Sequence, residues 1–391
     1  MNVSRRRLMQ AAGAAALASP AASAAETMPS NKFEGPNTPK ICLSLGDGGG
    51  GRGGAAAAAP SPGAAPDVSQ EDAARRIKQL GVNWVLSNGG PIPWEESRLK
   101  EQVERFKSYG LTLGNLMMAG FNNAIYARPG RDEDIEKVIA SIQAAGKAGL
   151  PVVEYNWYAH RAIEGYFEET GRAGVGLTSF DYEREVDSNG TKTKFRDLPP
   201  LPAEGPHTLD EMWANITYFL KKVIPVCEKA GVRMALHPND PPAPVSRGSQ
   251  QIMGSVEGWK KLIEIVKSPC SGITFDCGVT REMGGDPVEV CRYFASRDRI
   301  NHVHFRNVKV MKPYEHYSEV FIDEGENNMF AVMRELVRNK YTHMIYPEHP
   351  RGLDYDRDRG RLAGYPGGGG YASYAFQVGY ARAMMQAALT V

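Results

Sequence analysis

Short runs rich in Val, Ile, Leu and Phe recur along the chain, and each is followed by a stretch whose apolar positions repeat with the period of an α-helix. Runs of this length predict buried β-strands, and the longer periodic stretches predict helices that cover them. The predicted strands are 40–44, 83–87, 111–115, 151–156, 232–237, 272–276, 300–305 and 344–347. The predicted helices are 69–80, 95–109, 132–149, 209–231, 256–267, 287–296, 327–339 and 371–389.

Residues at the ends of the predicted helices support their limits. Gly110, Gly149 and Gly231 follow the periodic stretches, where a left-handed helix C-terminus favours a residue without Cβ. Strand-then-helix units repeated in this way predict an α/β fold, a parallel (β/α)8 TIM barrel. The main alternative is a doubly wound open sheet. That sheet would need fewer units, and no G-x-G-x-x-G turn leads from the first strand directly into a helix.

Three segments interrupt the alternation. Residues 46–66 are almost entirely Gly, Ala and Pro, a composition that predicts a flexible insertion after the first strand. Residues 158–207 are polar and separate the fourth strand from its helix, and residues 360–370 include a glycine run. All three would leave the C-terminal rim of the barrel, where barrel enzymes keep their sites, or lead into the last helix. Each segment is either a lid over the site or a tolerated insertion, and for residues 46–66 we favour a tolerated insertion.

Polar residues occupy the ends of the last four predicted strands. In strand order they are His237, Asp276, His304 and Glu348. A lone histidine at a strand end is usually structural, but four such residues at one barrel mouth are expected to share a pocket. Two imidazoles and two carboxylates form a mixed donor set that suits a divalent cation. The sequence therefore predicts a site for Mn²⁺ or Mg²⁺ rather than a thiolate-rich zinc site.

Three nearby residues have more than one interpretation. Strand alternation places His302 on the same face as His304 but deeper, where it would support the ligand. Glu154 lies near the end of the fourth strand. The alternatives for its role are a fifth metal ligand, a base, and the ion-pair partner of a neighbouring cation. Arg306 either holds the substrate or is a solvated or structural arginine.

These residues lie in motifs that resemble the mannonate dehydratase family. The sequence HPNDPP at 237–242 closely resembles that family's H-P-D-D-P-P signature. Further motifs follow in the family's order, with GIT at 272–274, HFR at 304–306, PEH at 347–349 and GY at 370–371. The resemblance extends from about residue 71 to the C-terminus. The proline-flanked signature is fairly specific, whereas the other motifs are shared with xylose-isomerase-like barrels.

The resemblance implies a hydro-lyase that converts D-mannonate to 2-keto-3-deoxy-D-gluconate and water. It implies a manganese site, built in the family from two histidines, a cysteine and an aspartate. The matching residues here are His237, Asp276, His304 and Glu348. It also links His349 and Tyr371 to proton transfer, and in this hypothesis Arg306 holds the substrate.

Several positions depart from the family pattern. Asp276 and Glu348 stand in place of the cysteine and the aspartate, and Tyr346 replaces an arginine. Pro350 replaces a glycine, and the arginine expected after Tyr371 is missing. Because arginine suits carboxylate recognition, a second hypothesis stays open, a metal-dependent isomerase, epimerase or keto-glycoside eliminase acting on a neutral sugar. A third is an exported sugar-binding protein without turnover.

Composition narrows the classes of function. The chain has 391 residues, 42% hydrophobic and 23% charged, and a formal net charge of +1, as is ordinary for a soluble globular enzyme. The near-neutral balance argues against a nucleic-acid partner. The expected partner is a small-molecule sugar acid or sugar, and the sequence leaves formation of a homo-oligomer open. The five cysteines are odd in number and match no zinc spacing.

The N-terminus resembles an export signal. Arg5, Arg6 and Arg7 precede an alanine-rich apolar stretch, and ASA at 22–24 offers small residues for cleavage. The paired arginines resemble a twin-arginine signal. The predicted organisation is a signal peptide over 1–24 and a single barrel domain over 25–391. The predicted location is periplasmic or secreted, without stable membrane association after export.

Overall fold

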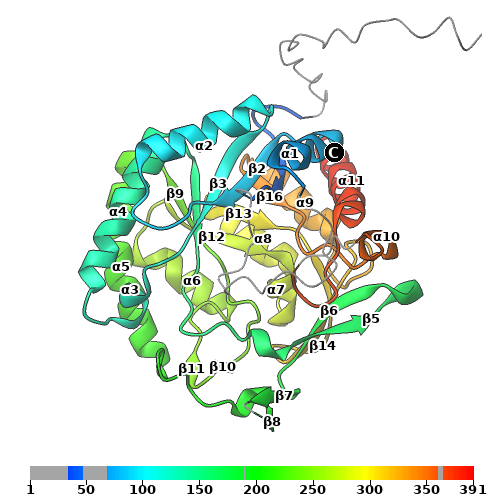
Figure 1. The fold of residues 1–391 in the computed structure, drawn as a ribbon. Helices are drawn as coiled ribbons and strands as arrows, with labels where there is room; N and C mark the ends of the chain where they lie inside the picture. Colours follow the sequence, from blue (N-terminus) through cyan, green and yellow to red (C-terminus); the bar gives the residue numbers. More distant parts are fainter. Residues whose placement is uncertain (1–33, 47–67, 189, 360–363) are drawn as a thin grey trace, which may run out of the picture.

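Eight parallel strands close into a barrel in a computed structural model that describes residues 34–46, 68–188, 190–359 and 364–391 (Figure 1). The barrel strands are β1 (Lys40–Ser44), β2 (Trp84–Asn88), β3 (Thr112–Met118), β4 (Val152–Tyr155), β9 (Arg233–Leu236), β12 (Ser271–Asp276), β13 (Ile300–His304) and β16 (Met344–Tyr346). Each strand pairs with its predecessor in this series, and β1 closes on β16 with Lys40 opposite Met344. The predicted (β/α)8 barrel is confirmed, and the open sheet is excluded.

Eight helices follow the barrel strands and surround them (Figure 1). They are α1 (Gln70–Gln79), α2 (Glu96–Ser108), α4 (Arg131–Lys147), α5 (Leu209–Ala230), α6 (Val256–Ile265), α8 (Pro287–Ala295), α9 (Met329–Arg338) and α11 (Tyr371–Ala388). Their ends follow the chemistry of the sequence. Thr208 and Glu211 form a capping box at the start of α5, and Gly231 ends that helix with a φ of 68°. All eight predicted helices are therefore present.

The core lies between the barrel and its helices. On α5, Ile216, Phe219, Leu220 and Val223 are fully buried, and they share the main hydrophobic cluster with strand residues such as Val153 and Met234. Burying each large apolar side chain contributes about 1.5–3 kcal/mol. This packing fixes the strand ends that carry the polar residues.

An antiparallel sheet beside the barrel was not predicted. Its strands, in spatial order, are β14 (Asn307–Lys312), β15 (His316–Val320), β6 (Gly176–Asp181) and β5 (Tyr166–Thr170). It joins part of the 158–207 segment, which the sequence presented only as a polar interruption, to the hairpin that follows β13. His316 pairs with Asp181, and Glu319 pairs with Thr178. The segment is thus an ordered extension of the fold in its described part.

The remaining elements are short. They are two hairpins, β7 (Glu185–Ser188) with β8 (Thr191–Lys194) and β10 (Val245–Ser246) with β11 (Ser249–Gln250), the helices α3 (Asn122–Tyr126), α7 (Cys277–Glu282) and α10 (Asp354–Arg357), and the 3-10 turns η1 (Ile163–Gly165), η2 (Arg172–Gly174) and η3 (Phe195–Asp197). Among the described residues, no helix is both long and apolar enough to cross a membrane. The predicted signal peptide, most of the 46–66 insertion and residues 360–363 lie outside the described residues.

Candidate active site and metal centre

The four residues predicted as ligands meet at one end of the barrel. They lie at the ends of β9, β12, β13 and β16 or in the one or two residues that follow, and these strands are neighbours in the closed sheet. His237 Nε2 lies 3.2 Å from His304 Nδ1. The same His304 nitrogen lies 2.9 Å from Glu348 Oε1 and 3.7 Å from Asp276 Oδ2. All four residues are buried. The convergence expected from the barrel topology is therefore present.

Local hydrogen bonds orient two of these side chains. His237 Nδ1 lies 2.7 Å from the Pro238 carbonyl, so this nitrogen carries the hydrogen and Nε2 presents its lone pair to the centre. Asp276 caps the short helix α7, because its Oδ1 accepts from the Val279 N–H at 2.8 Å. That bond leaves Oδ2 directed toward His304. Both arrangements are typical of side chains held ready for a metal ion.

The donor atoms at the centre fit a divalent cation. One atom each from His237, Asp276 and His304 lies within 4.8 Å of the other two. Glu348 Oε1 and His304 Nε2 are buried, and each lies close to another charged side chain of the cluster without a well-aligned hydrogen bond among the described residues. Facing nitrogen and oxygen lone pairs repel one another unless a proton or a cation lies between them. Mixed imidazole and carboxylate donors suit Mn²⁺, Mg²⁺ or Fe²⁺.

The charges around His304 are strongly coupled. Burial alone would lower the pKa of His304, but the carboxylates of Glu348 and Glu154 outweigh it and raise that pKa well above the usual value. Burial and the neighbouring His304 lower the pKa of His237. A site without a cation therefore holds a proton on His304, and a bound cation supplies the positive charge in its place.

Glu154 lies close to His304 from the side of β4. Its Oε1 is 3.3 Å from His304 Nε2 and accepts from the Thr274 hydroxyl at 3.0 Å. Its Oε2 accepts from the Asn115 amide at 3.0 Å. Together with His302 and His304 it forms a second group of potential ligands. These contacts fit a carboxylate that orients His304, one of the roles left open by the sequence.

His349 is held in one orientation beside the centre. Its Nδ1 lies 2.7 Å from Glu319 Oε2, and its Nε2 lies 3.5 Å from Glu348 Oε2. Its backbone adopts a left-handed φ of 49°, which costs about 1–3 kcal/mol in a residue with a side chain. Arg351 stabilises this conformation by donating to the His349 carbonyl at 2.8 Å and to Glu319 at 2.8 Å. The imidazole is thus oriented as a general base requires.

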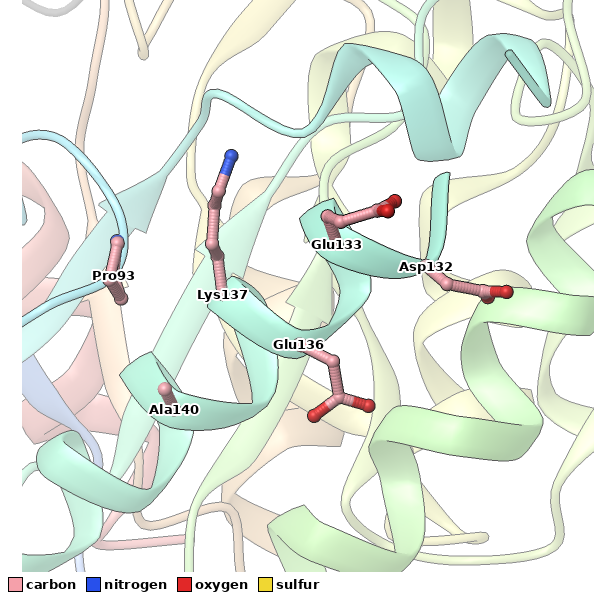
Figure 2. Close-up of a pocket in the computed structure, with 6 residues that line it drawn as sticks. All are labelled: Pro93, Asp132, Glu133, Glu136, Lys137 and Ala140. Carbon is pink, nitrogen blue, oxygen red and sulfur yellow. The ribbon is translucent and has the colours of Figure 1, made fainter. Parts of the chain in front are cut away.

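A cavity of about 420 Å³ opens onto these residues. His237, His304, Glu348 and His349 line it together with Asp240, Asn156, Tyr158 and Arg161, and the wall formed by β2, β3 and their loops contributes Asn88, Gly90, Pro91, Met117, Ala119 and Gly120. This volume suits a small sugar acid. Figure 2 shows a different, open depression on the surface of α4, where Asp132, Glu133 and Glu136 carry acidic side chains. Asp132 is already paired with Lys222 at 2.9 Å.

A family model described as D-mannonate dehydratase (UxuA) matches residues 69–389. The chain belongs to this family. The mannonate dehydratase of Thermotoga maritima is 29% identical over 309 residues, which cover 70% of this chain and 81% of the relative. The mannonate dehydratase of Lachnoclostridium phytofermentans is 28% identical over 321 residues, which cover 71% of this chain and 86% of the relative. The family resemblance of the sequence motifs is therefore confirmed.

Solved structures agree on the fold. The mannonate dehydratase from Streptococcus suis serotype 2 matches with a TM-score of 0.74 and 23% identity, covering 90% of this chain and 95% of that one. A xylose isomerase domain protein from Planctomyces limnophilus matches with a TM-score of 0.55 and 11% identity, covering 90% and 100%. At these identities the likeness establishes the xylose-isomerase-like barrel. Metal dependence is typical of the mannonate dehydratases, and the donor set described above matches it.

Arg306, which the sequence suggested as a substrate clamp, is buried instead. Its side chain is 2% exposed and is absent from the cavity lining among the described residues. The guanidinium lies within 2.7–3.5 Å of five carboxylates, those of Asp240, Asp276, Glu282, Glu319 and Glu348. Because so many buried negative charges repel one another, a central guanidinium stabilises them. These surroundings are those of a structural arginine, the alternative that the sequence left open beside the substrate clamp.

Tyr371 also lies elsewhere. Its hydroxyl donates to the Arg76 carbonyl in α1 at 3.2 Å, and it does not line the described cavity. The role in proton transfer that the family resemblance implied therefore has no geometric basis here. Tyr158 takes a place in the cavity instead, with its hydroxyl donating to the Pro238 carbonyl at 2.9 Å.

Three of the functional residues missed by sequence reasoning lie outside the barrel strands. Tyr158, Arg161 and Glu319 lie in the loop after β4 or in the added sheet, where no strand-end rule applies. Asp240 was visible in the HPNDPP motif, but no role was assigned to it. A polar aromatic residue shortly after the fourth strand was the available signal for Tyr158.

Proposed function

We propose that this protein dehydrates D-mannonate to 2-keto-3-deoxy-D-gluconate and water. The observation that carries the proposal is the meeting of His237, His304 and Asp276, with Glu348 2.9 Å from His304, beside an oriented histidine in a barrel of the mannonate dehydratase family. His237, Asp276, His304 and Glu348 would hold the cation. When bound, the cation acts as a Lewis acid that makes the C2 proton of the sugar acid more acidic.

The residues around the cavity supply the proton transfers. His349 Nε2 accepts the C2 proton, and the Glu319 carboxylate stabilises the imidazolium that results. Electrons of the C2–H bond form the C2–C3 double bond as the C3–O bond breaks. Burial raises the pKa of Tyr158, so its hydroxyl stays protonated. When this hydroxyl turns from the Pro238 carbonyl to the substrate, it can donate its proton to the departing C3 hydroxyl, which leaves as water. The enol then tautomerises to the 2-keto product.

We infer Mn²⁺ as the native ion from the donor chemistry, with Mg²⁺ and Fe²⁺ as the alternatives. The test is turnover of D-mannonate by protein stripped of metal and reloaded with each ion, with identification of the product. A His304→Ala variant should lose metal and at least about 100-fold in kcat/KM, because it removes the central ligand. His316→Ala, outside the described cavity lining, is the matched control. Full activity in His304→Ala would reject the proposed centre.

A second candidate is a metal-dependent isomerase or epimerase that acts on a neutral sugar. The observation that favours it is the carboxylate pair, Asp276 and Glu348, together with Tyr346 at the position of a family arginine. Assays with aldoses and ketoses under the same conditions separate the two reactions. Interconversion of sugars without formation of 2-keto-3-deoxy-D-gluconate would favour this candidate.

We also propose that the chain is exported through the twin-arginine signal at residues 1–24. The support is the sequence of three arginines, the apolar stretch and ASA at 22–24. Replacing Arg5, Arg6 and Arg7 by lysine should retain the protein in the cytoplasm of a host with a twin-arginine system. Unchanged export of that variant would contradict the proposal.

A further inference from the structure

A sugar acid carries a carboxylate, which needs a cationic partner in the cavity. Arg161 is the one lysine or arginine among the described residues that line this cavity. Arg306 does not fill this role, because it is buried and already faces five carboxylates. The site therefore presents a single arginine side chain to a bound ligand.

The backbone around Arg161 is fixed at two points. The Tyr158 hydroxyl donates to the Pro238 carbonyl at 2.9 Å, which ties the start of the segment to the loop after β9. The Tyr126 hydroxyl donates to the Ala159 carbonyl at 2.9 Å. A group held in this way loses little conformational entropy when a ligand binds.

The guanidinium is anchored at one nitrogen and open at the others. Arg161 Nε donates to the Asp240 carbonyl at 2.9 Å, and Nη2 lies 3.7 Å from Asp240 Oδ2. Nη1 and Nη2 make no hydrogen bond to any residue that the structure describes, and the side chain is 38% exposed. Two terminal N–H groups in a fixed fork match the two oxygens of a carboxylate.

We propose that Arg161 binds the carboxylate of the sugar acid and gives the site its preference for aldonates over neutral sugars. The inference rests on the proposed function, since it names the group that recognises the substrate class of that site. It also accounts for how a chain with Tyr346 at a family arginine position still binds an anionic substrate. Arg161 is assigned to recognition and not to proton transfer, so its loss should act mainly on affinity.

The test compares a charged aldonate with a neutral polyol of similar size. Calorimetry measures the affinity of metal-loaded protein for D-gluconate, an aldonate, and for D-mannitol, a polyol without a carboxylate. Steady-state kinetics gives kcat and KM for D-mannonate. The variants are Arg161→Gln and Arg161→Lys, with Arg196→Gln as the control, because Arg196 is exposed and pairs with Glu183 in the same excursion.

In Arg161→Gln, the affinity for D-gluconate should fall about 10- to 100-fold and KM for D-mannonate should rise by a similar factor. The affinity for D-mannitol, the metal content and kcat should change less than about threefold. Arg161→Lys should be intermediate, since it keeps the charge but loses the fork. Arg196→Gln should resemble the wild type throughout.

Three results would overturn the inference: unchanged D-gluconate affinity in Arg161→Gln, an equal loss of affinity for both ligands, or a wild-type protein that binds no aldonate. Failure of the proposed function is a separate result. If the wild type binds D-gluconate through Arg161 but does not dehydrate D-mannonate, the reaction is wrong and the anion site stands. If D-mannonate is dehydrated with a normal KM in Arg161→Gln, the reaction stands and the anion site is wrong.

Discussion

His304 connects most of the charged groups at the mouth of the barrel. It contacts His237, Asp276, Glu348 and Glu154, and all of these side chains are buried. In such surroundings one positive charge must balance the carboxylates, and either a proton or a cation provides it. The chemistry of this one imidazole therefore links cation binding to pH.

Binding of Mn²⁺ should release about one proton near pH 7, because the cation replaces the proton on His304. The neighbouring carboxylates raise the pKa of His304 in the cation-free protein, so its proton is present at pH 7. Below that raised pKa, the cation affinity should fall about tenfold for each pH unit. Calorimetry in buffers of different ionisation enthalpy counts the released protons. Equal heats in all buffers would contradict the prediction.

Glu319→Gln should reduce kcat about 10- to 100-fold while leaving the metal content near that of the wild type. Glu319 Oε2 lies 2.7 Å from His349 Nδ1, so this carboxylate orients the imidazole and stabilises its charged form. Glu319 is not one of the proposed ligands, so the metal should stay bound. Glu315→Gln is the control, because Glu315 lies on the same hairpin and pairs with Lys312. A loss of metal equal to the loss of activity would indicate a general structural role instead.

At the scale of elements, the antiparallel sheet β14–β15–β6–β5 completes a site that the barrel begins. The proposed ligands come from barrel strands or the residues directly after them, whereas Glu319 comes from β15. The sheet has its own hydrophobic cluster, which includes Phe180, Phe195 and Tyr317. The two parts of the site thus depend on different packing.

Phe180→Ala should therefore separate activity from metal binding. Truncating this fully buried ring costs about 3–5 kcal/mol at the site of the change and loosens the sheet that carries Glu319. We expect kcat to fall at least about tenfold, with the metal content within about twofold of the wild type. Tyr355→Ala, at a 55% exposed position, is the control. Parallel loss of metal and activity would show that the sheet also supports the ligands.

At the scale of the whole molecule, the cation and the fold should stabilise each other. The proposed ligands join four separate strands, and an unfolded chain does not hold them together. A cation at 100 times its Kd should add about 2.7 kcal/mol to the free energy of unfolding. Thermal unfolding with and without Mn²⁺ measures this, and His304→Ala should abolish the shift. An equal shift in the variant would place the cation elsewhere.

The barrel was predictable because its signals are local. Each strand from β1 to β16 in the closed sheet is a short apolar run, and each surrounding helix has its own periodic pattern and caps. The rule that parallel strands end at a common mouth then brought His237, Asp276, His304 and Glu348 together. Glycine residues after the predicted helices added limits that the structure matches closely.

The added sheet and the residues near it were not predictable in this way. β5 and β14 contain exposed polar positions, and β6 and β15 bury polar residues such as Ser179 and Glu319. Their pairing joins segments far apart in the chain, so no local period identifies them. The surroundings of Arg306 and Tyr371 were not predictable for the same reason. A guanidinium between five carboxylates and a hydroxyl bound to α1 are consequences of long-range packing.

The sequence by itself determined the alternation of strands and helices, the family and the four side chains at the strand ends, because each follows from residue type and spacing along the chain. Only the tertiary structure decided that Glu319 orients His349, that Arg306 is buried and that Tyr158 and Arg161 face the cavity. Those facts depend on distances between segments that no local pattern encodes. The barrel consists of eight strand–helix units, each recognisable from its own stretch of sequence. The cavity is formed by the long-range packing of the segments that join the strands.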